Sequence, residues 1–210
     1  MSSYVNRHLT CMCCGEPFEA RLLKGYLSTE MGLDTCPHEP AAYDVIVMCP
    51  NCGYATSEPY TKADPTAAAI VESSDYRAIR EDPAYDETAT KLLLAAHIDE
   101  KTGKILDAAD DYALAFWYLR EQGLPQATWA GSKLVAALEA YLNENKDVEM
   151  AMMLVDIQRQ LGRFDDAEET LDFLGEYIQD NMLLVKVAEL ERKLIHDGDR
   201  APHLMSEVTA

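Results

Sequence analysis

Long apolar runs are absent from this chain. None of its 210 residues lies in a stretch approaching the roughly 18 consecutive apolar residues that a membrane-spanning helix needs. The first eight residues also lack the apolar core of a secretory signal. We therefore expect a cytoplasmic protein that does not span a membrane. In a reducing compartment its six cysteines favour metal binding over disulfides.

Positive charge is scarce as well. The sequence has 18 Lys and Arg against 37 Asp and Glu, and a formal net charge of −19. Proteins that bind nucleic acids need cations facing the phosphates, and a surface this acidic repels a polyanion. Only Arg7, Arg21 and Lys24 within residues 1–60 could form a cationic patch. A nucleic-acid partner is therefore not expected, and charge favours a basic protein or peptide.

Motifs that mark common catalytic or cofactor sites are missing. The chain contains neither the zinc-protease pattern HExxH, nor the phosphate-binding GxxxxGK[ST], nor the dinucleotide-binding GxGxxG. Its adjacent carboxylates, Asp110–Asp111 and Glu168–Glu169, fall in expected helices, where sequence neighbours point in different directions. We interpret them as charges on solvated helix faces, and we expect no catalytic residue and no enzymatic activity.

Two cysteine pairs of the same shape stand out instead. In each pair the cysteines are separated by two residues and followed by glycine: Cys11-Met12-Cys13-Cys14-Gly15 and Cys49-Pro50-Asn51-Cys52-Gly53. This spacing is typical of zinc knuckles, in which a tight turn points two thiolates at one centre. Four thiolates fill the tetrahedral shell of zinc and leave no position for an activated water. We therefore predict one structural Zn²⁺ ion, bound by Cys11, Cys14, Cys49 and Cys52.

Three residues near the knuckles have no place in that site. Cys13 lies inside the first knuckle and could replace Cys11 or Cys14 as a ligand, although its spacing to either is poor, or it could be a redox thiol or an auxiliary metal ligand. Cys36 and His38 lie between the two knuckles, where Cys36 could be a redox thiol or the pair could bind an auxiliary metal. The alternative, which we favour, is that Cys36 is a small buried residue that packs the loop onto the ribbon.

The first 60 residues read as one zinc-ribbon-like domain. A short strand is expected to leave the first knuckle, within residues 9–26. The β-branched and aromatic stretch Ala42–Met48 predicts a second strand that leads into the second knuckle. The interval between the knuckles is long for a minimal ribbon, so an insertion is expected there.

Residues 61–200 read as a helical domain that begins after a Pro-containing linker. Apolar residues repeat at three- and four-residue intervals and predict helices over 66–80, 86–101, 105–122, 126–143, 150–161, 165–174 and 181–196. The best-defined hairpin is 150–174, in which Gly162 ends one helix and Asp165, with Glu168, caps the next. This hairpin is similar to a tetratricopeptide repeat. Residues 201–210 are expected to form a disordered tail. The predicted fold class is therefore mainly α, with a small β zinc ribbon followed by antiparallel helical hairpins.

The order of these features resembles an uncharacterised bacterial family, catalogued as domain of unknown function 2225. The specific part of the likeness is Tyr43 to Ala55, which contains the second knuckle. Family members usually have Cys-Pro at the first knuckle, whereas this chain has Cys11-Met12. The resemblance implies a zinc-ribbon-like head before tetratricopeptide-like helices, and it implies no known activity.

Together these patterns favour a non-enzymatic, zinc-stabilised interaction or scaffold module with a protein or peptide partner. Two alternatives remain open. One is a zinc-ribbon regulator that contacts nucleic acid through the few cations of the head, and the other is a thiol-based redox sensor.

Overall fold

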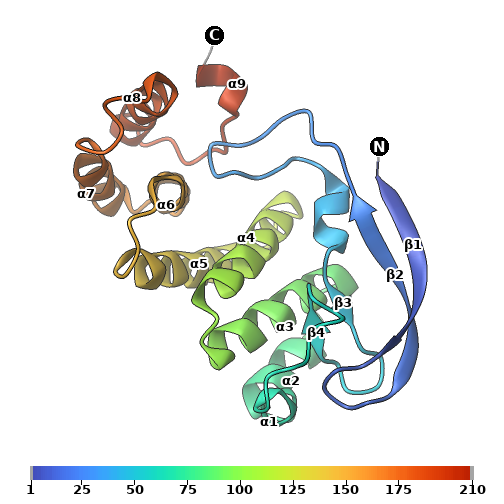
Figure 1. Ribbon diagram of the computed structural model, residues 1–210. Coiled ribbons are helices and arrows are strands. Elements are labelled where there is room, and N and C mark those ends of the chain that lie inside the picture. The colour runs from blue at the N-terminus through green and yellow to red at the C-terminus, as the bar shows by residue number, and fades with distance from the viewer. Residues whose placement is uncertain (1, 209–210) are drawn as a thin grey trace. The chain divides into compact units, whose positions relative to one another are not determined.

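The computed structural model describes residues 2–208, which are mainly helical with a small antiparallel β part (Figure 1). The predicted fold class is confirmed. The chain divides into two compact units. The first contains the residues up to Leu27 together with Glu39–Ala130, and the second contains Ser28–His38 together with Gly131–Ala210.

Two β-hairpins begin the first unit. Strand β1 (Ser3–Thr10) pairs antiparallel with β2 (Pro17–Gly25), and the short strands β3 (Val47–Met48) and β4 (Ala55–Thr56) pair in the same way. The long first hairpin is drawn in blue in Figure 1. Each hairpin ends in a cysteine knuckle, so the strands fix the positions of the thiols.

The predicted strand over Ala42–Met48 is wrong for most of its length. A 3₁₀ helix, η1, covers Pro40–Asp44, and only Val47 and Met48 are extended. Pro40 favours the turn because its ring fixes φ near the helical value. Tyr43 then packs edge-on against Tyr118, with ring centroids 5.2 Å apart. Tertiary packing therefore outweighs the strand propensity of this stretch.

The helices of the first unit follow the predicted order, with one break. They are α1 (Ala67–Val71), α2 (Ser74–Glu81), α3 (Glu87–Thr102) and α4 (Ile105–Glu121). The helix expected over 66–80 is divided, because the Ser73 hydroxyl accepts a hydrogen bond from the Tyr76 amide and starts α2. In α3, Asp86 is the N-cap and Gly103 ends the helix at φ 78°.

Helices α3 and α4 pack together and bury most of the apolar core of this unit. Leu92, Leu93 and Leu94 of α3 are fully buried, as is Leu119 of α4. Strand β4 packs on the same helix α3. The head and the first four helices therefore share one core.

One acidic residue that we expected at the surface, Asp111, is buried in this core. Asp111 is only 4% exposed, so the interpretation of Asp110–Asp111 as solvated charges is wrong for this residue. Burial, followed by the charge of Asp99, raises the pKa of Asp111 well above its usual range. Asp99 is itself paired with a cation, since Lys104 Nζ lies 3.4 Å from Asp99 Oδ1. Burial and the neighbouring carboxylate therefore favour the protonated form of Asp111.

The second unit is built from helices and one inserted loop. Its helices are the larger part of α5 (Ala127–Leu142), α6 (Val148–Gln160), α7 (Phe164–Leu174), α8 (Met182–His196) and α9 (Met205–Val208). Helices α6 and α7 form a hairpin that turns at Gly162 (φ 76°), as predicted. The expected cap at Asp165 is wrong, because α7 begins at Phe164 and its N-cap is Arg163, two residues before the predicted cap. Asp165 and Asp166 instead lie in the first turn, where the helix dipole stabilises negative charge.

Residues 28–38 lie in the second unit, not on the ribbon as we expected. The Leu33 amide donates to the His203 carbonyl at 2.9 Å, and the Met205 amide donates to the Met31 carbonyl at 2.8 Å. Leu33 also joins an apolar cluster that includes Val155 and Leu171. Non-local hydrogen bonds and burial of Leu33 therefore decide the place of this loop.

The compact units differ from the division expected at residue 60, because helices α1–α4 group with the head. The expected disordered tail is ordered over residues 201–208. His203 lies between two carboxylates, with Nδ1 2.9 Å from Glu207 Oε2 and Nε2 3.2 Å from Asp199 Oδ2. Residues 209 and 210 of the expected tail lie outside the described residues.

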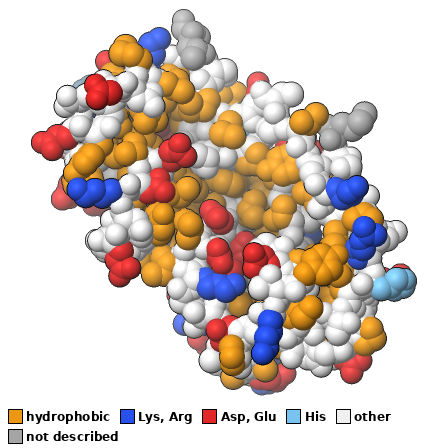
Figure 2. All heavy atoms as spheres, in the orientation of Figure 1, with side chains coloured by type: hydrophobic (Ala, Val, Ile, Leu, Met, Phe, Trp, Pro, Cys, Tyr) orange, Lys and Arg blue, Asp and Glu red, His pale blue; other side chains and the backbone are white. Residues whose placement is uncertain are grey.

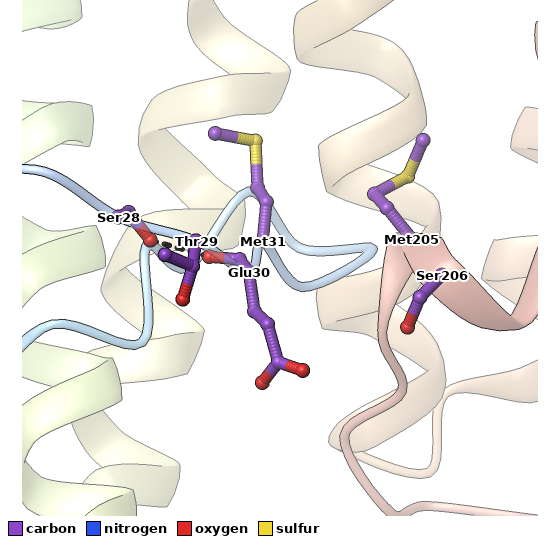
Figure 3. A pocket seen from close by; sticks show the side chains of 6 residues that line it. All are labelled: Ser28, Thr29, Glu30, Met31, Met205 and Ser206. Atoms are coloured by element: carbon purple, nitrogen blue, oxygen red, sulfur yellow. Dashed lines mark hydrogen bonds between the residues drawn. The ribbon is translucent and has the colours of Figure 1, made fainter.

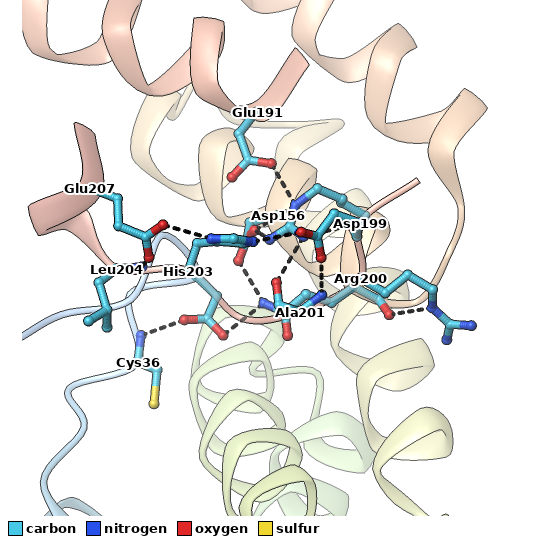
Figure 4. A network of polar contacts seen from close by, with 12 residues as sticks. Cys36, Asp156, Glu191, Asp199, Arg200, Ala201, His203, Leu204 and Glu207 are labelled. Carbon is cyan, nitrogen blue, oxygen red and sulfur yellow. Dashed lines mark hydrogen bonds and ion pairs between the residues drawn. The ribbon is translucent and has the colours of Figure 1, made fainter. Parts of the chain in front are cut away.

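A buried ion network organises the second unit (Figure 4). Arg159 of α6 is 0% exposed and binds the carboxylates of Asp156 and Glu191, the latter at 2.9 Å from Nε. Its Nη1 also donates to the carbonyl oxygens of Asp199 and Ala201, at 2.8 and 2.9 Å. One guanidinium thus joins α6, α8 and the segment that precedes α9.

The same network reaches the inserted loop. The Gln160 side-chain amide donates to Asp156 Oδ2 at 2.7 Å and to Asp34 Oδ2 at 3.1 Å. Asp34 in turn accepts the Cys36 amide at 3.0 Å. Two buried carboxylates therefore pair with Arg159, and a third, that of Asp34, is linked to them through Gln160. Burial, followed by the charge of Asp156, raises the pKa of Glu191 to about 9.

Glu191→Gln is expected to stabilise the protein in alkaline solution. Folding raises the pKa of Glu191 from its ordinary value of 4.5 to about 9. The contribution of this group to the free energy of unfolding is therefore fully present at pH values below 4.5 and is lost as the pH rises toward 9. Glutamine keeps the acceptor for Arg159 but does not ionise. We expect a gain of up to about 5 kcal/mol at pH 8.5 that shrinks toward zero near pH 4.5.

Urea unfolding followed by circular dichroism at several pH values measures this difference. Glu189→Gln is the matched control, because Glu189 is an exposed residue of the same helix. A Glu191→Gln effect of the same size at every pH would contradict the expectation.

Candidate metal centre

The two cysteine knuckles have the same backbone geometry. In the first, the Gly15 amide donates to the Cys11 carbonyl at 2.8 Å, and in the second the Gly53 amide donates to the Cys49 carbonyl at 2.9 Å. Gly15 and Gly53 have φ values of 81° and 79°, a left-handed conformation that favours glycine. Each knuckle is therefore a tight turn closed by its own hairpin.

The four predicted ligands lie together. Cys11, Cys14, Cys49 and Cys52 present their sulfurs within 4.8 Å of one another. The Sγ atoms of Cys11 and Cys52 are 3.7 Å apart, and those of Cys14 and Cys49 are 3.9 Å apart. These separations are too long for a disulfide bond, which is about 2.05 Å.

The donor set fits a tetrahedral metal ion. Four sulfurs placed about 2.3 Å from a central zinc ion are about 3.8 Å apart, which agrees with both sulfur–sulfur distances. Each hairpin supplies two thiols, so a bound ion would join the turn of β1–β2 to the turn of β3–β4. The arrangement is a candidate metal centre with four protein ligands.

Hydrogen bonds lower the pKa of one of the four thiols, that of Cys14, and so favour its thiolate form, which binds metal. The Glu16 amide, and next the Asn51 side chain at 3.5 Å from Sγ, lower the pKa of Cys14 to about 7. Burial raises the pKa of the Cys11 and Cys52 thiols. Metal binding must displace protons from these sulfurs, so its affinity depends on pH.

Two side chains of helix α2 donate hydrogen bonds to backbone carbonyl groups of the second knuckle. Tyr76 is fully buried, and its hydroxyl donates to the Gly53 carbonyl at 2.7 Å. Arg80 Nη1 donates to the Cys52 carbonyl at 3.3 Å, and a Cβ added at Gly53 would lie 3.1 Å from the Arg80 side chain. Because Gly53 has no side chain, it can adopt the left-handed conformation of the turn and leave room for Arg80 of α2. Sequence reasoning missed both supports, because nothing near Tyr76 or Arg80 in the sequence points to the cysteines.

Tyr76→Phe is expected to destabilise the first unit by about 1–2 kcal/mol, because it removes a buried hydrogen bond to the knuckle. The two tryptophans of the chain, Trp117 and Trp129, both belong to this unit, so fluorescence during urea unfolding reports on it. Metal transfer to a chromogenic chelator should also be faster. Tyr85→Phe, at a half-buried tyrosine of the same unit, is the control. Equal effects of the two substitutions would argue against a specific role for Tyr76.

The remaining candidate residues do not join the four-sulfur cluster. Cys13 is half-buried in the first knuckle, and burial raises the pKa of its thiol. Cys36 is 0% exposed and His38 is exposed, and both belong to the second unit. A fully buried thiol is poorly placed for reaction with oxidants in solution, so Cys36 fits a packing role, within the second unit and not on the ribbon. The auxiliary-metal alternative stays a hypothesis, since a ring nitrogen of His38 lies within 4.8 Å of the Cys36 sulfur.

The second unit also contains two hollows in its surface. A recess of about 290 Å³ is lined by Ser28, Thr29, Glu30, Met31, Met205 and Ser206 (Figure 3). It offers one carboxylate among hydroxyls and thioethers, without a pair of acid and base groups. A larger groove of about 670 Å³ lies along α5, α6 and α7.

Among residues 2–208, no helix is both long and apolar enough to cross a membrane. No family model, no curated protein and no solved structure matches the chain.

Proposed function

We propose that this chain is a non-enzymatic protein-interaction module, stabilised by one structural zinc ion in the cysteine cluster. The observation that carries the proposal is the cluster itself, with its four sulfurs at tetrahedral spacing. Zinc is the ion we propose because four thiolates in a tetrahedron are the usual ligands of structural zinc. Membership of the family of unknown function 2225, on the motif Tyr43–Ala55, is part of the same proposal.

Filling all four positions with protein sulfur supports a structural role. A catalytic zinc keeps one position open for water or substrate, whereas a structural zinc does not. The bonds from Tyr76 and Arg80 to the second knuckle would pass the stabilisation on to α2. X-ray absorption of the zinc-loaded protein tests this role. Four sulfur scatterers are expected, and an exchangeable oxygen ligand would overturn the structural assignment.

Exposed apolar side chains support the interaction role. Phe173 and Tyr177 in and just after α7 are 63% and 44% exposed, and Met182 and Leu183 of α8 are 69% and 45% exposed. Contiguous exposed apolar patches mark protein contacts, and the rings of Phe173 and Tyr177 lie together, with centroids 5.3 Å apart. A photo-reactive residue in place of Met182 should therefore cross-link a distinct protein in cells. The same residue in place of Asp75, an exposed residue of α2 in the first unit, should not. Identical cross-links from both positions, or none from either, would count against the role.

A zinc-ribbon regulator of nucleic acid is the second candidate. Arg7, Arg21 and Lys24 are exposed on β1 and β2, and Figure 2 shows basic side chains on this part of the surface. The Arg21 guanidinium lies 3.7 Å from the centre of the Tyr4 ring, which holds it in place. Mobility shifts at low salt decide this candidate, since phosphate contacts are strongest there.

A further inference from the structure

The second unit contains a groove with an apolar floor. It is lined by residues from the end of α5, the turn 143–147, most of the length of α6 and one side of α7, and its volume is about 670 Å³. Leu154 and Leu174 are buried, whereas Leu142 and Val148 are partly buried. Phe173 and Tyr177 complete the floor, with ring centroids 5.3 Å apart.

The two aromatic rings are unusually open to solvent for residues of their size. Phe173 is 63% exposed and Tyr177 is 44% exposed, whereas Phe116 and Tyr76 of the same chain are buried. Such rings bury a large area when a partner covers them. They are therefore candidates for the residues that dominate a contact.

Carboxylates surround this floor. The groove is lined by five acidic residues: Glu139, Glu144, Asp147, Asp166 and Glu169. One of them, Asp147, is the N-cap of α6 and accepts the Met150 amide at 3.1 Å. The single lysine of the lining is Lys146, whose ammonium group lies 5.5 Å from the centre of the Tyr177 ring. Figure 2 shows the acidic and hydrophobic side chains intermixed over α5–α7.

We propose that this groove binds a short basic segment of another protein, with two or three large apolar side chains on the floor and Lys or Arg side chains on the rim. The inference rests on the proposed function of protein binding, and it names the site and the chemistry of the partner. Charge complementarity selects the occupant. An excess of carboxylates over one lysine attracts cations and repels acidic peptides, nucleic acids and anionic lipid surfaces.

The size of the groove fits a short peptide segment better than a folded domain. A site of this volume takes several side chains, whereas two folded proteins need a wider contact, of about 800 Å² on each partner. A second copy of this chain is disfavoured because each copy carries a net charge of −19. An amphipathic basic peptide satisfies both the floor and the rim.

Peptide selection on the full-length protein tests this proposal. Displayed random peptides of about 12 residues are selected for binding, and the enriched sequences are measured singly by fluorescence anisotropy. We expect enriched peptides to combine large apolar residues with Lys and Arg. Their affinity should fall on the order of 10-fold with Phe173→Ser, which removes a central contact. Glu169→Lys should weaken binding to a similar extent, and added salt should reduce the difference between Glu169→Lys and the wild type.

Two control substitutions lie outside the groove. Leu183→Ser and Glu189→Lys change an exposed apolar and an exposed acidic residue of α8, neither of which lines the groove. Both should leave peptide affinity unchanged. Because all four altered residues are exposed, folding should be preserved, and circular dichroism checks it.

Other outcomes separate this inference from the proposed function. Peptides that bind equally well to all four variants would overturn the groove and leave protein binding elsewhere intact. The absence of enriched peptides would also overturn the groove, and the cross-links from position 182 would then decide the wider function. A dimer that Phe173→Ser converts to a monomer would assign the groove to a second copy of the chain, against the proposal.

Discussion

Replacing Cys49 with serine is expected to unfold the first unit. Cys49 is 2% exposed, and its amide donates to the Tyr54 carbonyl at 2.9 Å within the second knuckle. Structural zinc sites contribute about 10–16 kcal/mol of apparent binding free energy near neutral pH. That is as large as the whole stability of a typical domain, about 5–15 kcal/mol. Losing one of the four sulfurs should therefore remove most of the stabilisation of this unit.

Tryptophan fluorescence is the measurement for this substitution, since Trp117 and Trp129 both lie in the first unit. Hydrogen exchange should show loss of protection that extends from the two hairpins into α2, through the contacts of Tyr76 and Arg80. Cys13→Ser is the matched control, because Cys13 lies in the first knuckle but outside the cluster. A Cys49→Ser protein that unfolds like the Cys13→Ser protein would contradict a stabilising metal centre.

Arg159→Met is expected to cost about 3–5 kcal/mol, the usual effect of breaking a buried ion pair. The substitution leaves Asp156 and Glu191 buried without their cation, although both are at most 1% exposed. It also removes two hydrogen bonds to the carbonyl groups of residues 199 and 201. We therefore expect α9 and the inserted loop to lose their positions before the rest of the second unit unfolds.

Circular dichroism and hydrogen exchange measure this loss, because the second unit contains no tryptophan among the residues that the structure describes. Arg192→Met in α8 is the control. Arg192 pairs with Glu168 and Asp172 at the surface, with 44% of its side chain exposed, and such pairs contribute about 1 kcal/mol or less. If both substitutions had the same small effect, the buried network would not be the support that its geometry suggests.

Features that depend on a few adjacent residues could be predicted from the sequence. The knuckles are one example, because two cysteines, two intervening residues and a glycine already define the turn. Helix ends are another: Asp86 and Gly103 bound α3, and Asn181 caps α8. In each case the physical cause, a capping carboxylate or amide or a left-handed glycine, acts within one turn of the chain.

Features that depend on distant partners could not be predicted. Arg159 resembles a surface residue in the sequence, yet its partner Glu191 is 32 positions away. Gln160 is bonded to Asp34 across 126 positions, which is why the inserted loop could not be assigned to the second unit. The supports of the metal centre follow the same pattern, since Tyr76 meets Gly53 across 23 positions.

Native mass spectrometry of the chelator-free protein, before and after denaturation, is the most direct test of the metal centre. The structure places four sulfurs around one position, so we predict one zinc ion per folded chain. It should be released on unfolding and be absent from the Cys49→Ser protein. A folded chain without metal, or one that keeps its metal without Cys49, would contradict the account.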